Sequence, residues 1–180
     1  MIILQFLCSM NILIRPWQQV DAGPLVQLAD NKKIWNNVRD YFPHPYTDTH
    51  AKEWLALNVG VTPVLNFVIE VDGQFAGSIG MVPKTDVYKC NMEIGYWLGE
   101  PFWQKGIATK SIALICDVIK NEHPHIHRIY AEVFETNKAS MRALEKNGFA
   151  LECIRKQAVI KNKVLLDDYV WVKFISSTSS

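Results

Sequence analysis

The sequence predicts a single-domain α/β (α+β) fold, with a mixed, mostly antiparallel sheet of about seven strands flanked by about four helices. Three observations predict this class. Helix-like and strand-like segments follow one another along the chain, which begins and ends with strands. The pair Asp72-Gly73 separates two segments rich in β-formers and is a strong hairpin signal. The length of 180 residues fits one domain with its own hydrophobic core.

The chain opens with a strand and a helix. ILIRPW, residues 12–17, alternates apolar and polar side chains at its start, as strands do. A helical pattern begins near Val20, and Asp21 is a suitable residue to cap it. The apolar face of this helical pattern consists of Val26, Leu28 and Ile34.

A second helix and three antiparallel strands follow. Two prolines in FPHPY interrupt the helical pattern, and Thr47 or Asp48 can cap the next helix, DTHAKEWLAL. LNFVIEV, residues 65–71, is rich in β-formers and leads into the Asp72-Gly73 turn. QFAGSIGMV and NMEIGYWL then supply two further strands.

The second half of the chain predicts helix, strand, helix and a closing strand pair. The helix from Gly106 to Lys120 has apolar residues spaced on one face. RIYAEVF is a strand, and TNKASMRALEKNGF is a short helix capped by Asn137 and ended by Gly148. ALECIRKQAVI and LLDDYVWVKF, joined through residues 161–163, form the last two strands.

Charge and apolarity limit the kinds of partner. Nineteen basic residues balance 18 acidic ones, for a net charge of +1, and no basic stripe or tail is present. This balance argues against duplex nucleic acid as a partner. The apolar start MIILQFLCSM is too short to span a bilayer and lacks the basic n-region of a signal peptide. We therefore expect neither a nucleic-acid nor a membrane partner, and a cytoplasmic location.

We expect residues 10–175 to form the domain, residues 1–9 to be an N-terminal extension, and residues 176–180 to be a flexible tail. Met10 is an alternative start to Met1. No two cysteines have the spacing of a CxxC metal or redox motif, so free thiols in a reducing compartment are expected. The four cysteines are Cys8, Cys90, Cys116 and Cys153.

The run GEPFWQKGIAT places Gly106 and the small Ala108 where a strand is followed by a helix. The first turn of a helix has free backbone N–H groups and a partial positive charge. A glycine there lets a ligand approach without a Cβ clash, so a pyrophosphate fits. The run is explained equally well by a tight turn in which the glycine is needed only for its backbone dihedral angles. The GKS or GKT of a P-loop is absent.

Two segments carry a family resemblance. WQKGIA, residues 103–108, follows the signature Gln/Arg-x-x-Gly-x-Gly/Ala except for Trp103 at the first position. TNKASMRALEKNGF, residues 136–149, follows the pattern Asn-x-x-Ser/Ala, helix, Gly-Phe. With the strand EIGYWL, these segments resemble the GNAT superfamily of acetyl-coenzyme A-dependent N-acetyltransferases. The resemblance is nearest to the ribosomal-protein N-terminal acetyltransferase branch.

The resemblance implies an activity and a cofactor site. The enzyme would move an acetyl group from acetyl-coenzyme A (acetyl-CoA) to a primary amine, of a protein N-terminus or a small molecule, by direct attack in a ternary complex. No metal would be needed. The strand NMEIGYWL would splay from RIYAEVF and expose its main chain to the pantetheine arm. The implied cofactor-binding residues are Tyr96, Trp97, Leu98, Gln104, Lys105, Gly106, Ile107, Ala108, Thr109 and Asn137.

The resemblance also suggests catalytic residues. Glu93, on the strand that borders the thioester, is the candidate base, although an ordinary solvated or paired glutamate is the alternative. Leu144 stands where many relatives have a tyrosine acid, so Ser140 is the candidate acid, as in the ribosomal-protein branch. Asn137 would bond the pantetheine arm or would merely cap its helix. The missing tyrosine favours an alternative function, a non-catalytic acyl-CoA-binding or sensing module.

DYFPHPYT falls where the family places its acceptor loop, and Phe42, His44 and Tyr46 are the candidate acceptor wall. The alternative is a loop whose aromatic side chains fill the core. HPHIHR brings three histidines, at 123, 125 and 127, into alternating positions, but it is a connector with no nearby cysteine or carboxylate cluster, so we do not expect metal binding. The acceptor's identity stays open, and the aromatic last strand is suited to pairing in a homodimer.

Overall fold

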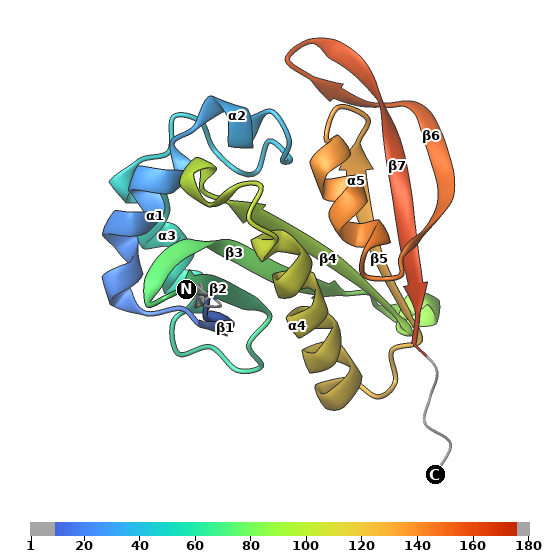
Figure 1. The fold of residues 1–180 in the computed structure, drawn as a ribbon, viewed down its shortest axis with the longest axis horizontal. Helices are drawn as coiled ribbons and strands as arrows, with labels where there is room; N and C mark the ends of the chain where they lie inside the picture. Colours follow the sequence, from blue (N-terminus) through green and yellow to red (C-terminus); the bar gives the residue numbers. More distant parts are fainter. Residues whose placement is uncertain (1–9, 176–180) are drawn as a thin grey trace, which may run out of the picture.

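Seven strands form one sheet in the order β1-β2-β3-β4-β5-β7-β6 (Figure 1). Neighbours pair antiparallel except β4 and β5, which are parallel. This computed structural model describes residues 10–175, so the predicted extension 1–9, with Cys8, and the predicted tail 176–180 lie outside it. The strands are β1 (Ile12–Pro16), β2 (Asn66–Val71), β3 (Gln74–Pro83), β4 (Asn91–Leu98), β5 (Arg128–Phe134), β6 (Ala150–Lys161) and β7 (Val164–Phe174). The predicted fold class is confirmed.

Within residues 10–175, five helices lie around the sheet. The longest, α4, crosses one face in the middle of the molecule, whereas α1 and α3 lie together near β3 (Figure 1). Two hydrophobic cores result, one around α4 and α5 and one around α1 and α3. The helices are α1 (Ala22–Ala29), α2 (Lys32–Trp35), α3 (Asp48–Asn58), α4 (Ile107–Glu122) and α5 (Lys138–Glu145), with short 3-10 turns η1 (Gln19–Asp21), η2 (Asp86–Tyr88) and η3 (Glu100–Phe102).

The first predicted helix is two helices, α1 and α2. The break occurs because Asn31 adopts an extended conformation and caps α2, accepting a hydrogen bond from the Lys33 N–H at 2.8 Å. Asp21 does not cap α1 with its side chain, because that carboxylate is buried against the Arg15 guanidinium, 2.7 Å away. Thr47 caps α3 as predicted, with its hydroxyl accepting from the His50 N–H.

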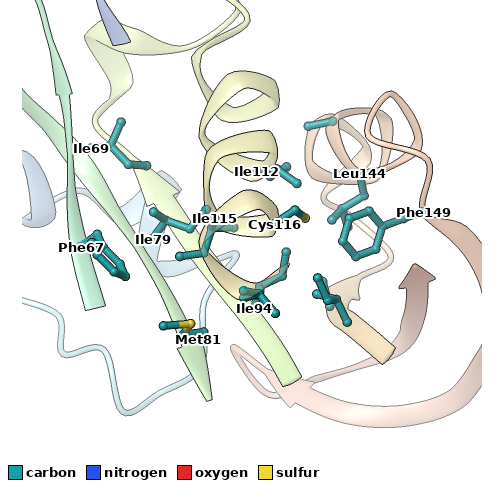
Figure 2. Packing of buried hydrophobic residues seen from close by; sticks show 14 of the residues in the cluster. Phe67, Ile69, Ile79, Met81, Ile94, Ile112, Ile115, Cys116, Leu144 and Phe149 are labelled. Carbon is teal, nitrogen blue, oxygen red and sulfur yellow. The ribbon is translucent and has the colours of Figure 1, made fainter. Parts of the chain in front are cut away.

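The face of α4 predicted to be apolar packs into the main core. Ile112, Ile115 and Ile119 are fully buried, and Figure 2 shows the first two between the β2–β4 strands and the α5 region. Burial of each such side chain contributes about 1.5–3 kcal/mol. Leu144 and Phe149 close the same core from α5 and the segment after it (Figure 2). The helix is therefore anchored firmly enough to hold its N-terminus in a fixed place.

The parallel pair β4–β5 is joined at one end alone. Pairing runs from Asn91 with Arg128 to Glu93 with Tyr130, and no further pairs follow, although β4 continues to Leu98 and β5 to Phe134. β4 stays paired with β3 along its whole length. Its other edge therefore leaves main-chain groups beyond Glu93 without a strand partner, and the predicted splay is present.

Both hairpins have turns that match their sequences. Asp72 and Gly73 take positive φ values of 50° and 80°, as a two-residue turn between β2 and β3 requires. Asn162 and Lys163 take 52° and 64° between β6 and β7. A bulge lies between Arg155 and Val159 of β6, so the end of the β6–β7 hairpin bends away from the line of the sheet.

Candidate active site

A cleft of about 850 Å³ opens where β4 and β5 diverge. The aromatic side chains of Trp17, Phe42, Tyr46, Trp54 and Trp97 form one wall. The opposite wall comes from β5, α5 and the end of β6, and charged side chains occupy the floor. A cleft with apolar walls and a few convergent polar groups is typical of a small-molecule site.

The N-terminus of α4 is open to a ligand. Gly106 caps the helix with φ 76°, a left-handed conformation that favours glycine, and a Cβ there would meet no atom within 4 Å. The Lys110 N–H makes the first bond, to the Gly106 carbonyl at 3.1 Å, so the N–H groups of residues 107–109 precede the helical ladder. Gln104 and Lys105 are exposed beside them. Both the turn geometry and the free donors predicted for Gly106 are therefore present.

Trp103 braces this loop, which explains how it can replace the Gln or Arg of the family signature. Its indole N–H donates to the carbonyl of Leu98, the last residue of β4, at 2.8 Å. Its ring packs against the main core. The loop between β4 and α4 is thereby fixed relative to the strand, a role that sequence reasoning missed because no local pattern indicates it.

The free edge of β4 lies beside the cleft. Gly95, Tyr96 and Trp97 line it, and a Cβ on Gly95 would have no neighbour within 4 Å. Trp97 packs against Phe42 and Phe75, with ring centroids 5.5 and 6.1 Å away. The side chain of Leu98 is buried, and its carbonyl already accepts the Trp103 indole N–H.

Ser140 lies on the far side of the cleft from this edge. Its hydroxyl is 2.7 Å from the hydroxyl of Tyr96, and its N–H donates to the Asn137 side chain at 3.1 Å, which caps α5. Burial raises the pKa of Tyr96 to about 12, although the bond to Ser140 opposes this, so the phenol stays protonated at neutral pH. Leu144 is fully buried in the core, so its position cannot present an acid to the cleft.

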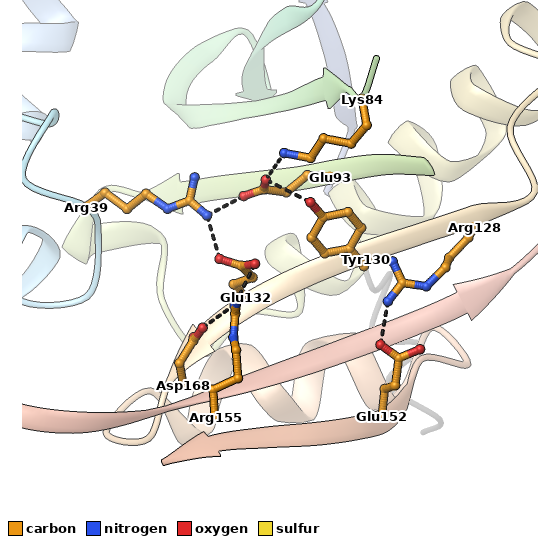
Figure 3. Close-up of polar contacts among 9 residues, drawn as sticks. All are labelled: Arg39, Lys84, Glu93, Arg128, Tyr130, Glu132, Glu152, Arg155 and Asp168. Atoms are coloured by element: carbon orange, nitrogen blue, oxygen red, sulfur yellow. Dashed lines mark hydrogen bonds and ion pairs between the residues drawn. The ribbon is translucent and has the colours of Figure 1, made fainter. Parts of the chain in front are cut away.

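Glu93 sits on the floor of the cleft in a network of charges (Figure 3). Its two oxygens accept from Arg39 at 2.5 Å and from Lys84 at 2.7 Å, and the Tyr130 hydroxyl donates to the second at 3.3 Å. Burial alone would raise the pKa of Glu93. The hydrogen bond from Lys84 and the charges of Arg39 and Lys84 outweigh it, so the pKa is below its ordinary value.

The network continues through residues that the sequence did not single out. Arg39 also donates to Glu132 at 2.8 Å, and Arg155 pairs with Glu132 at 2.5 Å and with Asp168 (Figure 3). Asp168 is 3% exposed, and its Oδ1 has no hydrogen-bond partner among the described residues. Such an oxygen costs about 1–3 kcal/mol.

Two of the three side chains predicted to contact the acceptor line the cleft. Phe42 and Tyr46 line the cleft, with their rings 5.1 Å apart. His44 is not among the lining residues. Its Nδ1 lies 3.3 Å from Asp30, and its ring stacks on Trp35 at 5.6 Å. The loop thus presents two of the three predicted side chains.

The end of the β6–β7 hairpin lies over the same region. Residues 158–161 line the cleft, and Lys161 is 3% exposed. Its ammonium group lies 2.6 Å from Asp40 and 3.7 Å above the Trp35 ring. These contacts tie the hairpin to α2 and to the loop that follows it, and both the hairpin and that loop border the cleft.

The histidine connector shows no metal site. The rings of His123 and His125 lie 6.1 Å apart, and across residues 10–175 no three His, Cys, Asp or Glu side chains are grouped for metal binding. Within the same residues, no helix is long and apolar enough to cross a membrane.

Comparisons with known proteins agree with this geometry. A stretch of 77 residues is 42% identical to a probable N-acetyltransferase, YjcK, of Bacillus subtilis (strain 168), and covers 43% of this chain and 42% of that one. The spermidine N(1)-acetyltransferase of Escherichia coli (strain K12) is 23% identical over 79% of this chain and 74% of its own. The structure of RimL, a ribosomal-protein acetyltransferase in complex with coenzyme A, superposes with a TM-score of 0.77 at 20% identity, covering 93% and 96% of the two chains. The model of the acetyltransferase (GNAT) domain matches residues 11–150, and the chain belongs to that family.

Proposed function

We propose that this protein transfers the acetyl group of acetyl-CoA to a primary amine. The observation that carries the proposal is the meeting of two sets of free main-chain groups, those at the start of α4 and those along the β4 edge. The β4 edge lines the cleft at residues 95–97, together with charged side chains, and α4 starts shortly after the end of the same strand. Relatives named as N-acetyltransferases and a similar fold solved with coenzyme A support it.

The start of α4 is the proposed pyrophosphate site. The proposed site consists of residues 104–109. The open space at Gly106 and its left-handed backbone would let phosphate oxygens reach the free N–H groups of residues 107–109. Lys105 adds an exposed positive charge. The pantetheine arm would run along Tyr96–Leu98, with Asn137 on the opposite wall. This arrangement places the thioester between Gly95 and Ser140.

In the proposed reaction the neutral amine attacks the thioester carbonyl carbon directly. Main-chain N–H groups of β4 stabilise the oxyanion. When the carbon–sulfur bond breaks, the thiolate takes a proton from the Ser140 hydroxyl, and the protonated Tyr96 passes its own proton to Ser140 through their 2.7 Å contact. The proton that leaves the nitrogen as the amide forms then restores the phenol through water. The missing tyrosine at Leu144 is thus no obstacle to leaving-group protonation.

Glu93 stays a prediction as the base. Its oxygens already accept from Lys84 and Arg39, and its lowered pKa makes it a weaker proton acceptor than an ordinary glutamate. These contacts support a role in fixing Arg39, which lines the cleft, and Lys84, which lies beside it. A base role for Glu93 would run through a water molecule.

The acceptor is proposed to carry one ammonium group on an apolar body, because aromatic side chains form one wall of the cleft and the ion-pair network beside it is balanced in charge. Glu93, Glu132 and Asp168 face Arg39, Lys84 and Arg155. A cleft beside which the charges are balanced is less suited to spermidine, the acceptor named for one relative. Protein N-termini and small aromatic amines fit it better.

A thiol-release assay tests the proposal. The protein is incubated with acetyl-CoA and, separately, phenethylamine, spermidine and a short peptide with a free N-terminus. Free thiol is expected with at least one amine, and coenzyme A alone is expected to raise the melting temperature. Stabilisation without thiol release for any amine would favour the sensing module instead. No stabilisation by the coenzyme would contradict both functions.

A further inference from the structure

Among the residues that the structure describes, Asp168 is the buried carboxylate of the cleft lining that has an unpartnered oxygen. Its Oδ2 pairs with Arg155, while its Oδ1 has no partner. The side chain is 4% exposed and yet lines the cleft. By contrast, Glu93 engages both of its oxygens, and Glu132 is held by Arg39 and Arg155. An unpartnered acceptor in this position is suited to a ligand's N–H group.

The strand register places Asp168 on the acceptor side of the sheet. Asp168 stands opposite Phe134, the last residue of β5, and side chains alternate between the two faces of a sheet. Glu132, two residues earlier on β5, therefore shares its face, and so does Arg155 of β6, which stands opposite Asp168. Ser140 follows on α5, just beyond the end of β5. The carboxylate thus lies where the diverging strands are widest apart.

We propose that Asp168 receives the ammonium group of the acceptor and takes its proton before the amine attacks. The inference rests on the proposed acetyl transfer and adds the group that activates the nucleophile. An amine in the cleft would donate to Oδ1, the oxygen left free by Arg155. The aromatic wall of Phe42, Tyr46 and Trp97 would pack on the rest of the acceptor.

The proton balance is complete with the groups present. The ammonium nitrogen gives one proton to Asp168, which becomes a neutral acid, and the freed electron pair forms the bond to the carbonyl carbon. The carbon–sulfur bond breaks, and its pair stays on sulfur. The nitrogen loses its second proton to water as the amide forms, and water returns a proton to Tyr96, which has supplied the thiolate through Ser140. After the amide leaves, Asp168 returns its proton to water.

The surroundings of Asp168 make it a better proton acceptor than an ordinary aspartate. Burial raises its pKa, and the nearby charge of Glu132 raises it further. The charges of Arg155 and Arg39 and the hydrogen bond from Arg155 oppose these effects without cancelling them. These are the charged groups that face the carboxylate from β5, β6 and the α2–α3 loop. Activity should therefore fall on acidification at a pH above the ordinary aspartate range.

The first test compares Asp168→Asn with Asp167→Asn. Asp167 is the next residue on the same strand, but it pairs with Lys156 at 2.7 Å and is not among the residues lining the cleft. Asp168→Asn should lower kcat/KM with the best of phenethylamine, spermidine and the peptide by about 10²–10⁴-fold, while stabilisation by coenzyme A is kept. Asp167→Asn should stay within about twofold of wild type. Loss of less than about threefold in Asp168→Asn would overturn the proposal.

Arg155→Gln separates proton transfer from a purely structural role. If Asp168 only anchors Arg155, both variants should lose activity equally at every pH. If Asp168 accepts the proton, Asp168→Asn should abolish the acidic limb of the pH profile. Arg155→Gln should instead move that limb to higher pH, because it removes the opposing positive charge. Equal, pH-independent losses would overturn the proposal.

A second measurement does not depend on turnover. With ¹³C-labelled aspartate carboxyl groups and bound coenzyme A, the signal missing in Asp168→Asn should titrate above the other aspartates. It should also move on addition of phenethylamine. If that signal moves but no amine releases thiol, the ammonium site stands and the proposed acetyl transfer fails. A signal that titrates with the others and moves with none of the three amines would overturn the site.

Discussion

The hydroxyl groups of Tyr96 and Ser140 lie 2.7 Å apart, joining the free edge of β4 to the first turn of α5 across the cleft. The contact orients the Ser140 hydroxyl and supplies it with a protonated partner, because the pKa of Tyr96 is raised to about 12 by burial. A serine alone is a weak acid, and the pair gives it a route for proton replacement.

Ser140→Ala is expected to lower kcat by about 10²-fold with little change in coenzyme affinity. Tyr96→Phe leaves the serine hydroxyl in place and should cost about tenfold or less, the size of one hydrogen bond. Steady-state kinetics of both variants check the order of the two losses. If Tyr96→Phe lowers kcat more than Ser140→Ala does, the tyrosine is itself the acid that protonates the thiolate. If neither variant lowers kcat, neither hydroxyl takes part in the mechanism.

Gly106→Asp is expected to abolish coenzyme binding, because the side chain places a negative charge and bulk where the pyrophosphate is proposed to lie. Its matched control is Gly60→Asp, since Gly60 also has a positive φ, 73°, and open space around it, but follows the end of α3 instead of preceding α4. Both variants should lose about 1–3 kcal/mol of stability from backbone strain. Isothermal titration with coenzyme A should distinguish them, and unchanged affinity in Gly106→Asp would count against the phosphate site.

Glu93→Gln should destabilise the protein near neutral pH by about 1–2 kcal/mol, because the carboxylate bridges Lys84 and Arg39. The pKa of Glu93 is lower in the folded state, so its stabilisation is full above the ordinary glutamate value. It disappears as the pH falls through the lowered value. Urea unfolding of wild type and variant at several pH values should show the gap narrowing on acidification. A gap that widens in acid would contradict the ion-paired state.

The same variant also addresses the base. If Glu93 acts only by holding the two cations, Glu93→Gln should lose less activity than Asp168→Asn and should keep the acidic limb of the pH profile. Loss of that limb in Glu93→Gln, with the limb kept in Asp168→Asn, would restore the role predicted for Glu93 from the sequence.

Lys161→Ala should loosen the hairpin over the cleft, since the Lys161 ammonium group joins Asp40 and the Trp35 ring to the β6–β7 turn. Loss of the cation–π contact is worth about 1–2 kcal/mol. We expect a rise in the KM of the acceptor of about five- to tenfold, with the coenzyme KM unchanged. Lys163→Ala, at an exposed position of the same turn, is the control. Equal effects of the two changes would assign the result to the turn rather than to the contact.

The elements near the proposed cofactor site could be predicted because local signals encode them. The glycine of α4 stands before a helix with an apolar stripe, and Asn137 and Gly148 bracket α5. The amino-acid composition of residues 91–98 and 128–134 predicts these two strands with the bounds that the structure shows. The division of the first helix was missed, because the Asn31 cap lies within a continuous apolar pattern.

The charged floor could not be predicted in the same way. Glu93, Arg39, Glu132, Arg155 and Asp168 come from four strands and a loop, and the strand register alone brings them together. Nothing near Asp168 in the sequence distinguishes it from Asp167, although one is buried and the other pairs at the surface. The direction of His44, towards Asp30 rather than the cleft, likewise depends on tertiary packing.

The most direct test of the central claim is a crystal structure with coenzyme A bound. The proposed site predicts pyrophosphate oxygens within hydrogen-bond distance of the N–H groups at residues 106–109. It also predicts the pantetheine along the free edge of β4, with the sulfur facing the Ser140 hydroxyl. A coenzyme bound elsewhere on the protein, or a sulfur remote from both Gly95 and Ser140, would contradict the proposed site and the chemistry assigned to it.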